Sequence, residues 1–173
     1  MQAFADVEAL VFDVFGTIVD WRNGVAREAA AFLARHAPGA NPLAFADVWR
    51  RRYSLAMEEV RSGRRPFVRL DVLHRENLEA LLPEFAIDPA TVPASELDAL
   101  SLVWRRLDPW PDSVPGLTRL KRGFIVAPLS NGNIRLMLDM RSAPACRGTP
   151  FWALSSLRLT SRARKHMCAP QRP

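Results

Sequence analysis

The sequence places one carboxylate where it could act as a nucleophile. Asp13 directly follows the short apolar run Ala9-Leu10-Val11-Phe12 and precedes Gly16 and Thr17. A carboxylate at a strand end, beside a glycine-threonine turn that supplies backbone N–H groups, can form an ester or an acyl phosphate with its substrate. The alternative is that Asp13 only caps a turn, as aspartates often do.

A second polar group follows a second apolar run. Ser130, Asn131 and Gly132 come directly after residues 124–129, a run that is typical of another buried strand despite Pro128. Open α/β sheets bind their ligands at the carboxyl ends of the strands, which favours a functional role at such positions. Ser130 and Asn131 could also be ordinary turn or helix-capping residues.

An arginine between the two runs is a candidate for binding an anion. Arg50 begins the run Arg50-Arg51-Arg52 inside a helical region. A guanidinium group stays charged and presents several donors in a fixed fork, which suits that task. A run of charges is more commonly a solvated helix face, so both interpretations stay open.

The elements that must position these groups are two strands and a helical block between them. The runs at residues 9–12 and 124–129 are typical of parallel strands that are buried on both faces. From residue 23 to about residue 107, apolar residues repeat at steps of three and four, which predicts four helices. The four stripes are Val25, Ala29, Phe32 and Leu33; Val48, Tyr53, Leu55, Met57 and Val60; Leu70, Leu73, Leu78, Leu81 and Leu82; and Leu97, Leu100, Val103, Trp104 and Leu107. A lone strand has nothing to pair with, so the block is an insertion between strands of one sheet and the fold class is α/β.

The other aromatic and histidine side chains predict no further site. His36 and His74 are isolated in the sequence and are expected at the surface. Trp49, Trp104 and Trp110 are expected to pack in the core or the helical block rather than to form a ligand cage.

The positive charge is confined to one end of the chain. The 173 residues contain 24 Lys and Arg against 18 Asp and Glu, a net charge of +6. Residues 1–140 hold 17 basic and 18 acidic side chains, whereas residues 141–173 hold seven basic side chains and no acidic one. A basic excess therefore predicts an anionic partner only for the tail, and none for the nearly neutral remainder.

Cysteine usage and the N-terminus exclude several classes of protein. Cys146 and Cys168 are the two cysteines, so residues 1–140 cannot form a disulfide scaffold or a Cys-ligated zinc module. With His166 they lack the spacing of a structural zinc site, so no metal or cofactor is expected. The N-terminus has acids where a secretory signal carries bases, and no window approaches the roughly 18 apolar residues of a membrane span. We expect a cytoplasmic protein.

Two motifs together resemble those of the haloacid dehalogenase superfamily, and more narrowly of the type II 2-haloacid dehalogenases. They are Phe12-Asp13-Val14-Phe15-Gly16-Thr17 and Leu129-Ser130-Asn131-Gly132, with further similarity in Val48-Trp49-Arg50, in Trp110-Pro111-Asp112-Ser113-Val114-Pro115-Gly116-Leu117 and from Arg119 to Asn133. The resemblance covers residues 8–140. It implies a Rossmann-like core, with an incomplete parallel sheet here, and an inserted α-helical cap.

The resemblance also implies an arrangement of domains. Residues 1–20 would carry the first core strand and the nucleophile loop, and residues 21–108 the helical cap. Residues 109–140 would return to the core with the second strand and the Ser-Asn motif. Residues 141–173 would be a basic tail that is disordered or foreign to the family.

For function, the resemblance implies hydrolytic dehalogenation of small 2-haloalkanoic acids to 2-hydroxy acids. Asp13 would attack the halogen-bearing carbon, and water would then hydrolyse the resulting ester. Thr17 would hold the region of Asp13, while Arg50 and Asn131 would contact the halide. Ser130 and Asn131, with the backbone N–H groups near Val14 and Phe15, would bind the substrate carboxylate. No cofactor is implied, a homodimer is possible, and the partner is a small 2-haloacid rather than a specific nucleic acid or a membrane.

Phe15 bears on the kind of leaving group. The resemblance implies that phosphatases of this superfamily carry a second aspartate two positions after the nucleophile, where this chain has Phe15, and that this aspartate protonates an alkoxide leaving group. A halide leaves as a weak base and needs no such acid. Phe15 therefore favours dehalogenation over hydrolysis of a phosphate ester, which is kept as an alternative, although dehalogenases of this type more usually have tyrosine there.

The similarity to the family ends near Met140. The lysine and the acidic segment that the resemblance implies after the second motif are missing, since Lys165 is the only lysine after Lys121 and no acidic residue follows Asp139. We expect a chain that is truncated or frameshifted after Met140, with very low activity. The alternative is a non-catalytic protein whose basic tail binds polyanions.

Overall fold

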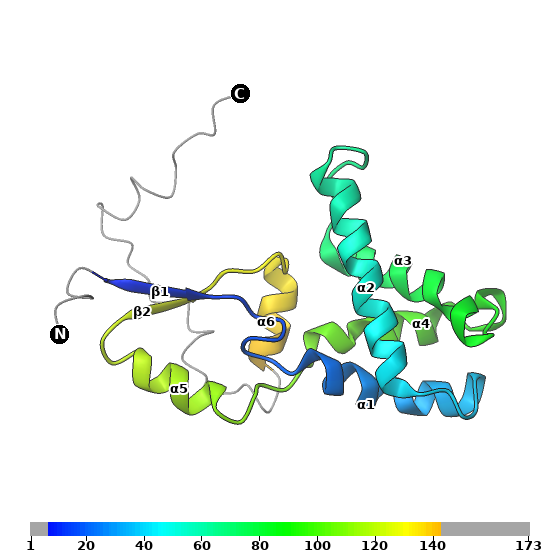
Figure 1. The fold of residues 1–173 in the computed structure, drawn as a ribbon, viewed down its shortest axis with the longest axis horizontal. Coiled ribbons are helices and arrows are strands. Elements are labelled where there is room, and N and C mark those ends of the chain that lie inside the picture. Colours follow the sequence, from blue (N-terminus) through cyan, green and yellow to red (C-terminus); the bar gives the residue numbers. More distant parts are fainter. Residues whose placement is uncertain (1–6, 143–173) are drawn as a thin grey trace.

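The computed structural model describes residues 7–142, which divide between a small parallel sheet with its helices and a block of helices (Figure 1). The elements, with η marking a 3₁₀ helix, are β1 (Ala9–Phe12), α1 (Trp21–His36), α2 (Pro42–Arg61), α3 (Leu70–Leu81), η1 (Leu82–Phe85), η2 (Pro89–Thr91), α4 (Ala94–Ser101), η3 (Leu102–Arg105), α5 (Ser113–Leu120), β2 (Ile125–Pro128) and α6 (Ile134–Ser142). The α/β class and the small parallel sheet predicted from the sequence are confirmed.

β1 and β2 pair in parallel although a helical block separates them in the chain. Phe12 is the register partner of Pro128, and the Leu129 N–H donates to the Phe12 carbonyl at 2.8 Å. Pro128 lies at the last position of β2, where a missing N–H interrupts little pairing. Both strands therefore end at the same edge of the sheet, which brings the residues after Phe12 close to those after Pro128.

The prediction that both strands are buried on both faces is wrong. Val11 is 59% exposed and Ile125 is 46% exposed, whereas Val126 on the opposite face is only 8% exposed. Within residues 7–142 each strand has one neighbour, and one face of the pair is left largely open. The apolar runs are those of a fully buried strand, but the described residues supply too little structure to cover both faces.

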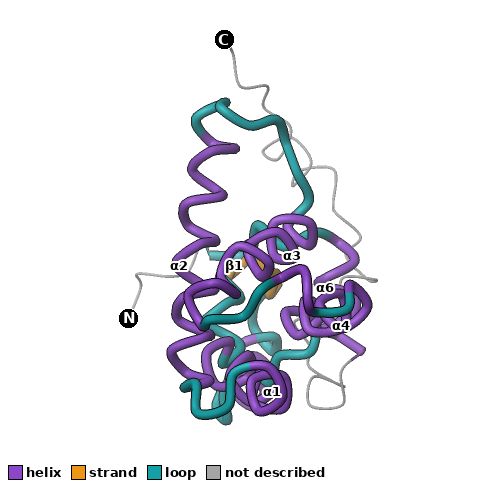
Figure 2. Tube along the Cα trace, turned by 90° about the vertical axis from the view of Figure 1, so that its right-hand side faces the viewer, coloured by secondary structure: helices purple, strands orange, loops and turns teal. Residues whose placement is uncertain are grey.

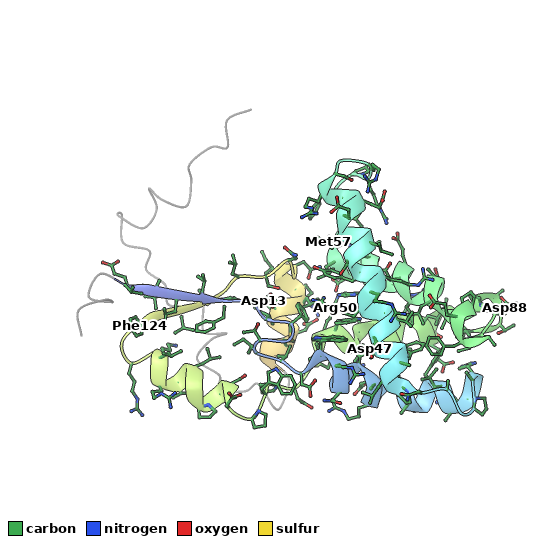
Figure 3. The ribbon with its side chains drawn as sticks, in the orientation of Figure 1. Asp13, Asp47, Arg50, Met57, Asp88 and Phe124 are labelled. Carbon is green, nitrogen blue, oxygen red and sulfur yellow. The ribbon has the colours of Figure 1, made fainter. Side chains whose placement is uncertain are left out.

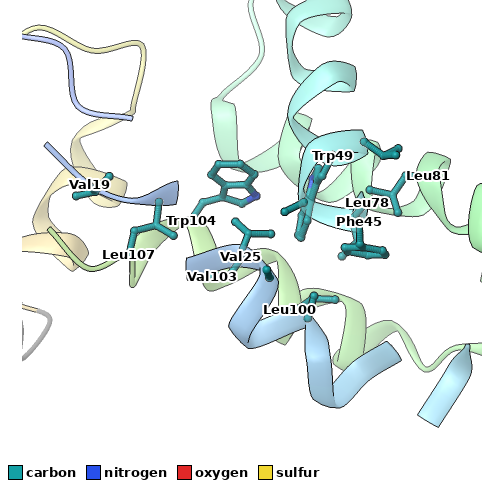
Figure 4. Packing of buried hydrophobic residues seen from close by; sticks show 14 of the residues in the cluster. Val19, Val25, Phe45, Trp49, Leu78, Leu81, Leu100, Val103, Trp104 and Leu107 are labelled. Carbon is teal, nitrogen blue, oxygen red and sulfur yellow. The ribbon is translucent and has the colours of Figure 1, made fainter. Parts of the chain in front are cut away.

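The helical block has its own aromatic core. Phe45 and Trp49 on α2 pack edge to face with their ring centroids 5.9 Å apart, and Trp49 meets Trp104 of η3 at 5.6 Å (Figure 4). All three side chains are essentially inaccessible to solvent, which confirms the packing predicted for Trp49 and Trp104. The fourth predicted helical stripe is split in the structure between α4 and η3.

Two short connections join the block to the sheet, and they run side by side. Val19 and Pro109 form an antiparallel bridge, with the Asp20 N–H donating to the Asp108 carbonyl and the Trp110 N–H donating to the Ile18 carbonyl, each at 2.9 Å. Viewed from the helical side, the block lies in front of the two strands (Figure 2). The chain therefore enters and leaves the block through one neck, as an insertion must.

We expect Phe45→Ala to lower the free energy of unfolding by about 3–5 kcal/mol, because it removes a fully buried ring and leaves a cavity in the block. The matched control is Phe67→Ala, since Phe67 is 85% exposed and its truncation should change stability by only about 0.5 kcal/mol. Urea denaturation of both variants measures the difference. Equal losses would contradict the assignment of the core.

Candidate active site

Asp13 lies just past β1, on a tight turn. Gly16 has φ 100°, a left-handed conformation that favours glycine. The Thr17 hydroxyl donates to Asp13 Oδ2 at 3.5 Å, a long contact, and the Trp110 indole N–H donates to the Gly16 carbonyl at 3.2 Å. The Asp13 side chain itself is exposed at the sheet edge. A carboxylate in this position can reach a ligand without moving the backbone.

The turn also presents backbone donors. The Val14 carbonyl accepts from the N–H groups of Ile18 and Val19 at 2.9 and 3.1 Å, which folds the turn back on itself. Within the described residues, the N–H groups of Val14 and Phe15 donate to no other group. Adjacent unpaired N–H groups beside a turn are suited to hold an anion.

The loop after β2 contributes amide and hydroxyl groups. Asn131 Nδ2 donates to the Tyr53 hydroxyl of α2 at 3.1 Å. Ser130 Oγ accepts from the Gly132 N–H at 3.1 Å, and Asn133 Oδ1 accepts from the Leu136 N–H at 2.9 Å, which caps α6. Ser130 thus shapes the turn, while Asn131 reaches across to the helical block.

Arg50 differs from the other arginines of its run. Its guanidinium lies over the Tyr53 ring at 4.6 Å and over the Trp21 ring at 5.6 Å. No carboxylate of residues 7–142 forms an ion pair with it, whereas Arg52 pairs with Glu84 at 2.7 Å. Aromatic faces hold the cation without using its N–H donors for a counter-ion, so those donors can serve a bound anion.

These contacts bring Asp13, Asn131 and Arg50 to one place. Asp13 and Asn131 lie at the same sheet edge, Asn131 contacts Tyr53, and Tyr53 contacts Arg50. Figure 3 draws Arg50 on the side of α2 that is turned toward Asp13. Within residues 7–142, Arg50 forms no hydrogen bond or ion pair with Asp13 or Asn131. The polar groups are therefore grouped at the junction of sheet and block rather than joined to one another.

The prediction that His74 lies at the surface is wrong, because its side chain is 2% exposed. The ring stacks on Trp104 at 4.3 Å and lies 5.9 Å from the Tyr53 ring. Neither ring nitrogen has a hydrogen-bond partner among the described residues. Burial lowers the pKa of His74 to about 3, the nearby carboxylate of Asp71 opposes this, and Arg50 adds to it. His74 is therefore a neutral neighbour of Arg50.

Three residues that contact the site were not predicted from the sequence as part of it. Trp21 and Tyr53 hold the Arg50 guanidinium, and Tyr53 also accepts from Asn131. His74 stacks beside them. The signal in the sequence is weak, because single aromatic side chains and histidines within three separate helices usually indicate packing. Only the spacing of Tyr53, one helical turn after Arg50, could have suggested a shared face.

Several predictions concern residues outside the described ranges. The basic tail at 141–173, with Cys146, Lys165 and Cys168, falls there except for residues 141–142, which end α6. Among the described residues, no group of three or more His, Cys, Asp or Glu side chains is placed to hold a metal ion. In the same part of the chain, no helix is both long and apolar enough to cross a membrane.

Comparison with protein families decides the relationship. Residues 7–142 match the family described as haloacid dehalogenase-like hydrolase. The chain belongs to this family. Comparison with curated proteins gave no significant match.

Solved structures of haloacid dehalogenases are similar to this family member. The defluorinating L-2-haloacid dehalogenase Rha0230 is 51% identical with a TM-score of 0.77, and the match covers 84% of this chain and 58% of that one. The L-2-haloacid dehalogenase PA0810 is 39% identical with a TM-score of 0.73, over 84% of this chain and 60% of that one. An L-2-haloacid dehalogenase from Xanthobacter autotrophicus, 22% identical over 83% of this chain and 54% of that one, shares the fold with a TM-score of 0.67. This chain therefore spans less than two thirds of the length of these relatives.

The buried, neutral His74 makes stability depend on pH. Below pH 6.5 the unfolded chain binds a proton at this histidine, but the folded chain does so only near pH 3, so the unfolding free energy falls as pH falls through that window. We expect His74→Phe to remove this dependence. Between pH 7.5 and pH 5, the unfolding free energy of the original chain should fall by about 2 kcal/mol more than that of the variant. Denaturation at both pH values measures it. His36→Gln is the control: this histidine is 21% exposed and lies 3.1 Å from a Glu96 carboxylate oxygen, so its replacement should keep the dependence that His74 causes. An unchanged dependence in His74→Phe would contradict the prediction.

Proposed function

We propose that this chain attacks small 2-haloacids through Asp13. A carboxylate oxygen of Asp13 forms a bond to the halogen-bearing carbon, the carbon–halogen bond breaks with its electron pair, and a halide ion and an aspartyl ester result. The observation that carries the proposal is that an exposed Asp13 lies at the same junction of sheet and block as Arg50, a cation that pairs with no carboxylate of the described residues. The 51% identity to a defluorinating L-2-haloacid dehalogenase supports this choice of substrate.

The other predicted residues contact the substrate carboxylate and the halogen that leaves as halide. The N–H groups of Val14 and Phe15, with Ser130, bind the substrate carboxylate beside the turn, and Thr17 steadies Asp13. Arg50 and Asn131 face the departing halide. Stabilising charge where it develops in the transition state lowers the barrier more than binding the substrate alone does.

Phe15 supports a halide over an alkoxide as the leaving group. Its ring meets Trp104 edge to face at 6.1 Å, so the position two residues after Asp13 contributes an apolar wall and no proton donor. A halide needs no protonation to leave, whereas an alkoxide does. Hydrolysis of a phosphate ester is therefore the less favoured function of this site.

Breakdown of the ester is the slow step in our proposal. Hydrolysis requires a base that activates water, and within residues 7–142 the hydrogen-bond partner of the Asp13 carboxylate is the Thr17 hydroxyl, which is no such base. Release of halide is then expected to stop near one equivalent per chain, with the ester retained on Asp13.

Incubation with (S)-2-chloropropionate tests the first step. We expect the intact mass of the chain to rise by one esterified propionate group, with peptide mapping placing it on Asp13 and chloride release matching it in amount. Asp13→Ala should show neither. Asp112→Ala is the matched control, because Asp112 is exposed and makes no side-chain capping bond at the start of α5, and it should react like the original chain.

Absence of both ester and chloride from the original chain would contradict the proposed function. Phosphate release from a phosphate monoester, lost in Asp13→Ala, would favour the phosphatase alternative instead.

Arg50→Lys should lower the rate constant of ester formation by about 10²-fold, because lysine keeps the charge but loses the planar fork of donors and its place between two aromatic rings. Quenched time courses followed by mass spectrometry give the rate constant. Arg51→Lys, at the neighbouring exposed position, is the control and should react within about twofold of the original chain. Similar rates for the two variants would exclude the role of Arg50.

A further inference from the structure

A cluster of four polar side chains joins the helical block to the loop after β2. Asp71 comes from α3 and Arg105 from η3, whereas Asn133 and Asp139 come from the loop and from α6. Asn133 Nδ2 donates to Asp71 Oδ2 at 2.6 Å. Arg105 contacts both Asp71 carboxylate oxygens, at 2.8 and 3.2 Å, and Asp139 at 2.8 Å. We call Asp71, Arg105, Asn133 and Asp139 the clasp.

The clasp is more enclosed than the other arginine ion pairs of the described residues, each of which has at least one partner that is more exposed. The exposed fractions of its charged side chains are 19% for Arg105, 25% for Asp71 and 29% for Asp139. Hydrogen bonds from Asn133 and Arg105 lower the pKa of Asp71 despite its burial. Partly buried, hydrogen-bonded charges favour a defined geometry, since moving Asp71 or Arg105 removes hydrogen bonds from a charge that water reaches only in part.

Asn133 connects the clasp to the candidate site. Its Oδ1 caps α6 by accepting from the Leu136 N–H at 2.9 Å, while its Nδ2 is held by Asp71, so the amide is engaged at both ends. Asn131 lies two residues earlier in the same loop and donates to Tyr53. A shift of Asn133 would therefore move the loop that carries Ser130 and Asn131.

We propose that Asp71 is a positioning residue, which sets the place of Asn131 through Asn133 and holds the helical block over Asp13. The expected effect on the reaction rate rests on the proposed function, whereas the role of the clasp in fixing the loop does not. Asp71 touches neither substrate nor Asp13 and acts only through the loop.

The effect of Asp71 is tested with Asp71→Asn in the full chain. The carboxylate that accepts from Asn133 and Arg105 is replaced by an amide of the same shape. We expect the rate constant of Asp13 esterification at saturating (S)-2-chloropropionate to fall about tenfold, with the half-saturating concentration changed by less than about twofold. Hydrogen exchange of the amides in residues 130–136 should accelerate about tenfold, because the capped loop is released.

Three further variants separate positioning from a general loss of stability. Asn133→Ser keeps an oxygen that can cap α6 but loses the donor to Asp71, and should reproduce the effect. Combining Asp71→Asn with Asn133→Asp restores a donor–acceptor pair in the opposite direction and should recover most of the rate. Asp98→Asn removes a partner of Arg75 from an exposed ion pair within the block and should leave both the rate and the exchange unchanged.

The outcomes are distinguishable. An unchanged rate and unchanged exchange in Asp71→Asn, or no recovery in the combined variant, would overturn the positioning role. If the original chain does not esterify Asp13, the proposed function fails. Hydrogen exchange then tests the positioning role of Asp71 by itself: no acceleration of exchange in Asp71→Asn or Asn133→Ser would overturn that role.

Discussion

The parallel pairing of β1 with β2 is the constraint on which the site depends. Hydrogen bonds from the Ile125 N–H to the Glu8 carbonyl at 2.9 Å and from the Leu129 N–H to the Phe12 carbonyl at 2.8 Å bracket the register. A slip by one residue would turn Val126 from the buried face to the open one, so burial of that face helps to specify the pairing. Because the register holds, the turn at Asp13 and the loop after β2 leave the sheet at one edge.

Parallel strands need a crossover connection, and here the crossover contains the whole helical block. The neck at Val19 and Pro109 ties both ends of the block to the sheet at one point. A single neck leaves the angle of the block over Asp13 to be set by other contacts. Within residues 7–142, the polar contacts of Tyr53 and Asp71 with the loop after β2, and of Arg105 with Asp139 of α6, contribute to this restraint. The loop therefore both carries candidate site residues and orients the block above them.

The sequence could predict what is periodic or local and not what depends on distant partners. The position of Asp13 at a strand end is predictable because an apolar run stops there, and the α/β class follows from the helical insertion. Burial of His74 could not be predicted, since a lone histidine has no pattern and its stacking on Trp104 depends on the path of η3. The pairing of Asp71 with Arg105 joins separate elements, and one more charge on an amphipathic helix carries no signal of its partner.

Arg50 illustrates the same limit and explains how a site can be kept open. In the sequence it is the first of three adjacent arginines, and Arg52 behaves as a solvated helix face predicts, with an ion pair to Glu84. Arg50 instead rests on Trp21 and Tyr53, contacts worth about 0.5–1 kcal/mol each when exposed and about 2 when desolvated. A carboxylate partner would occupy the fork of donors, whereas the rings stabilise the cation and leave the fork available. An arginine held in this way is prepared to receive an anion that the protein itself does not provide.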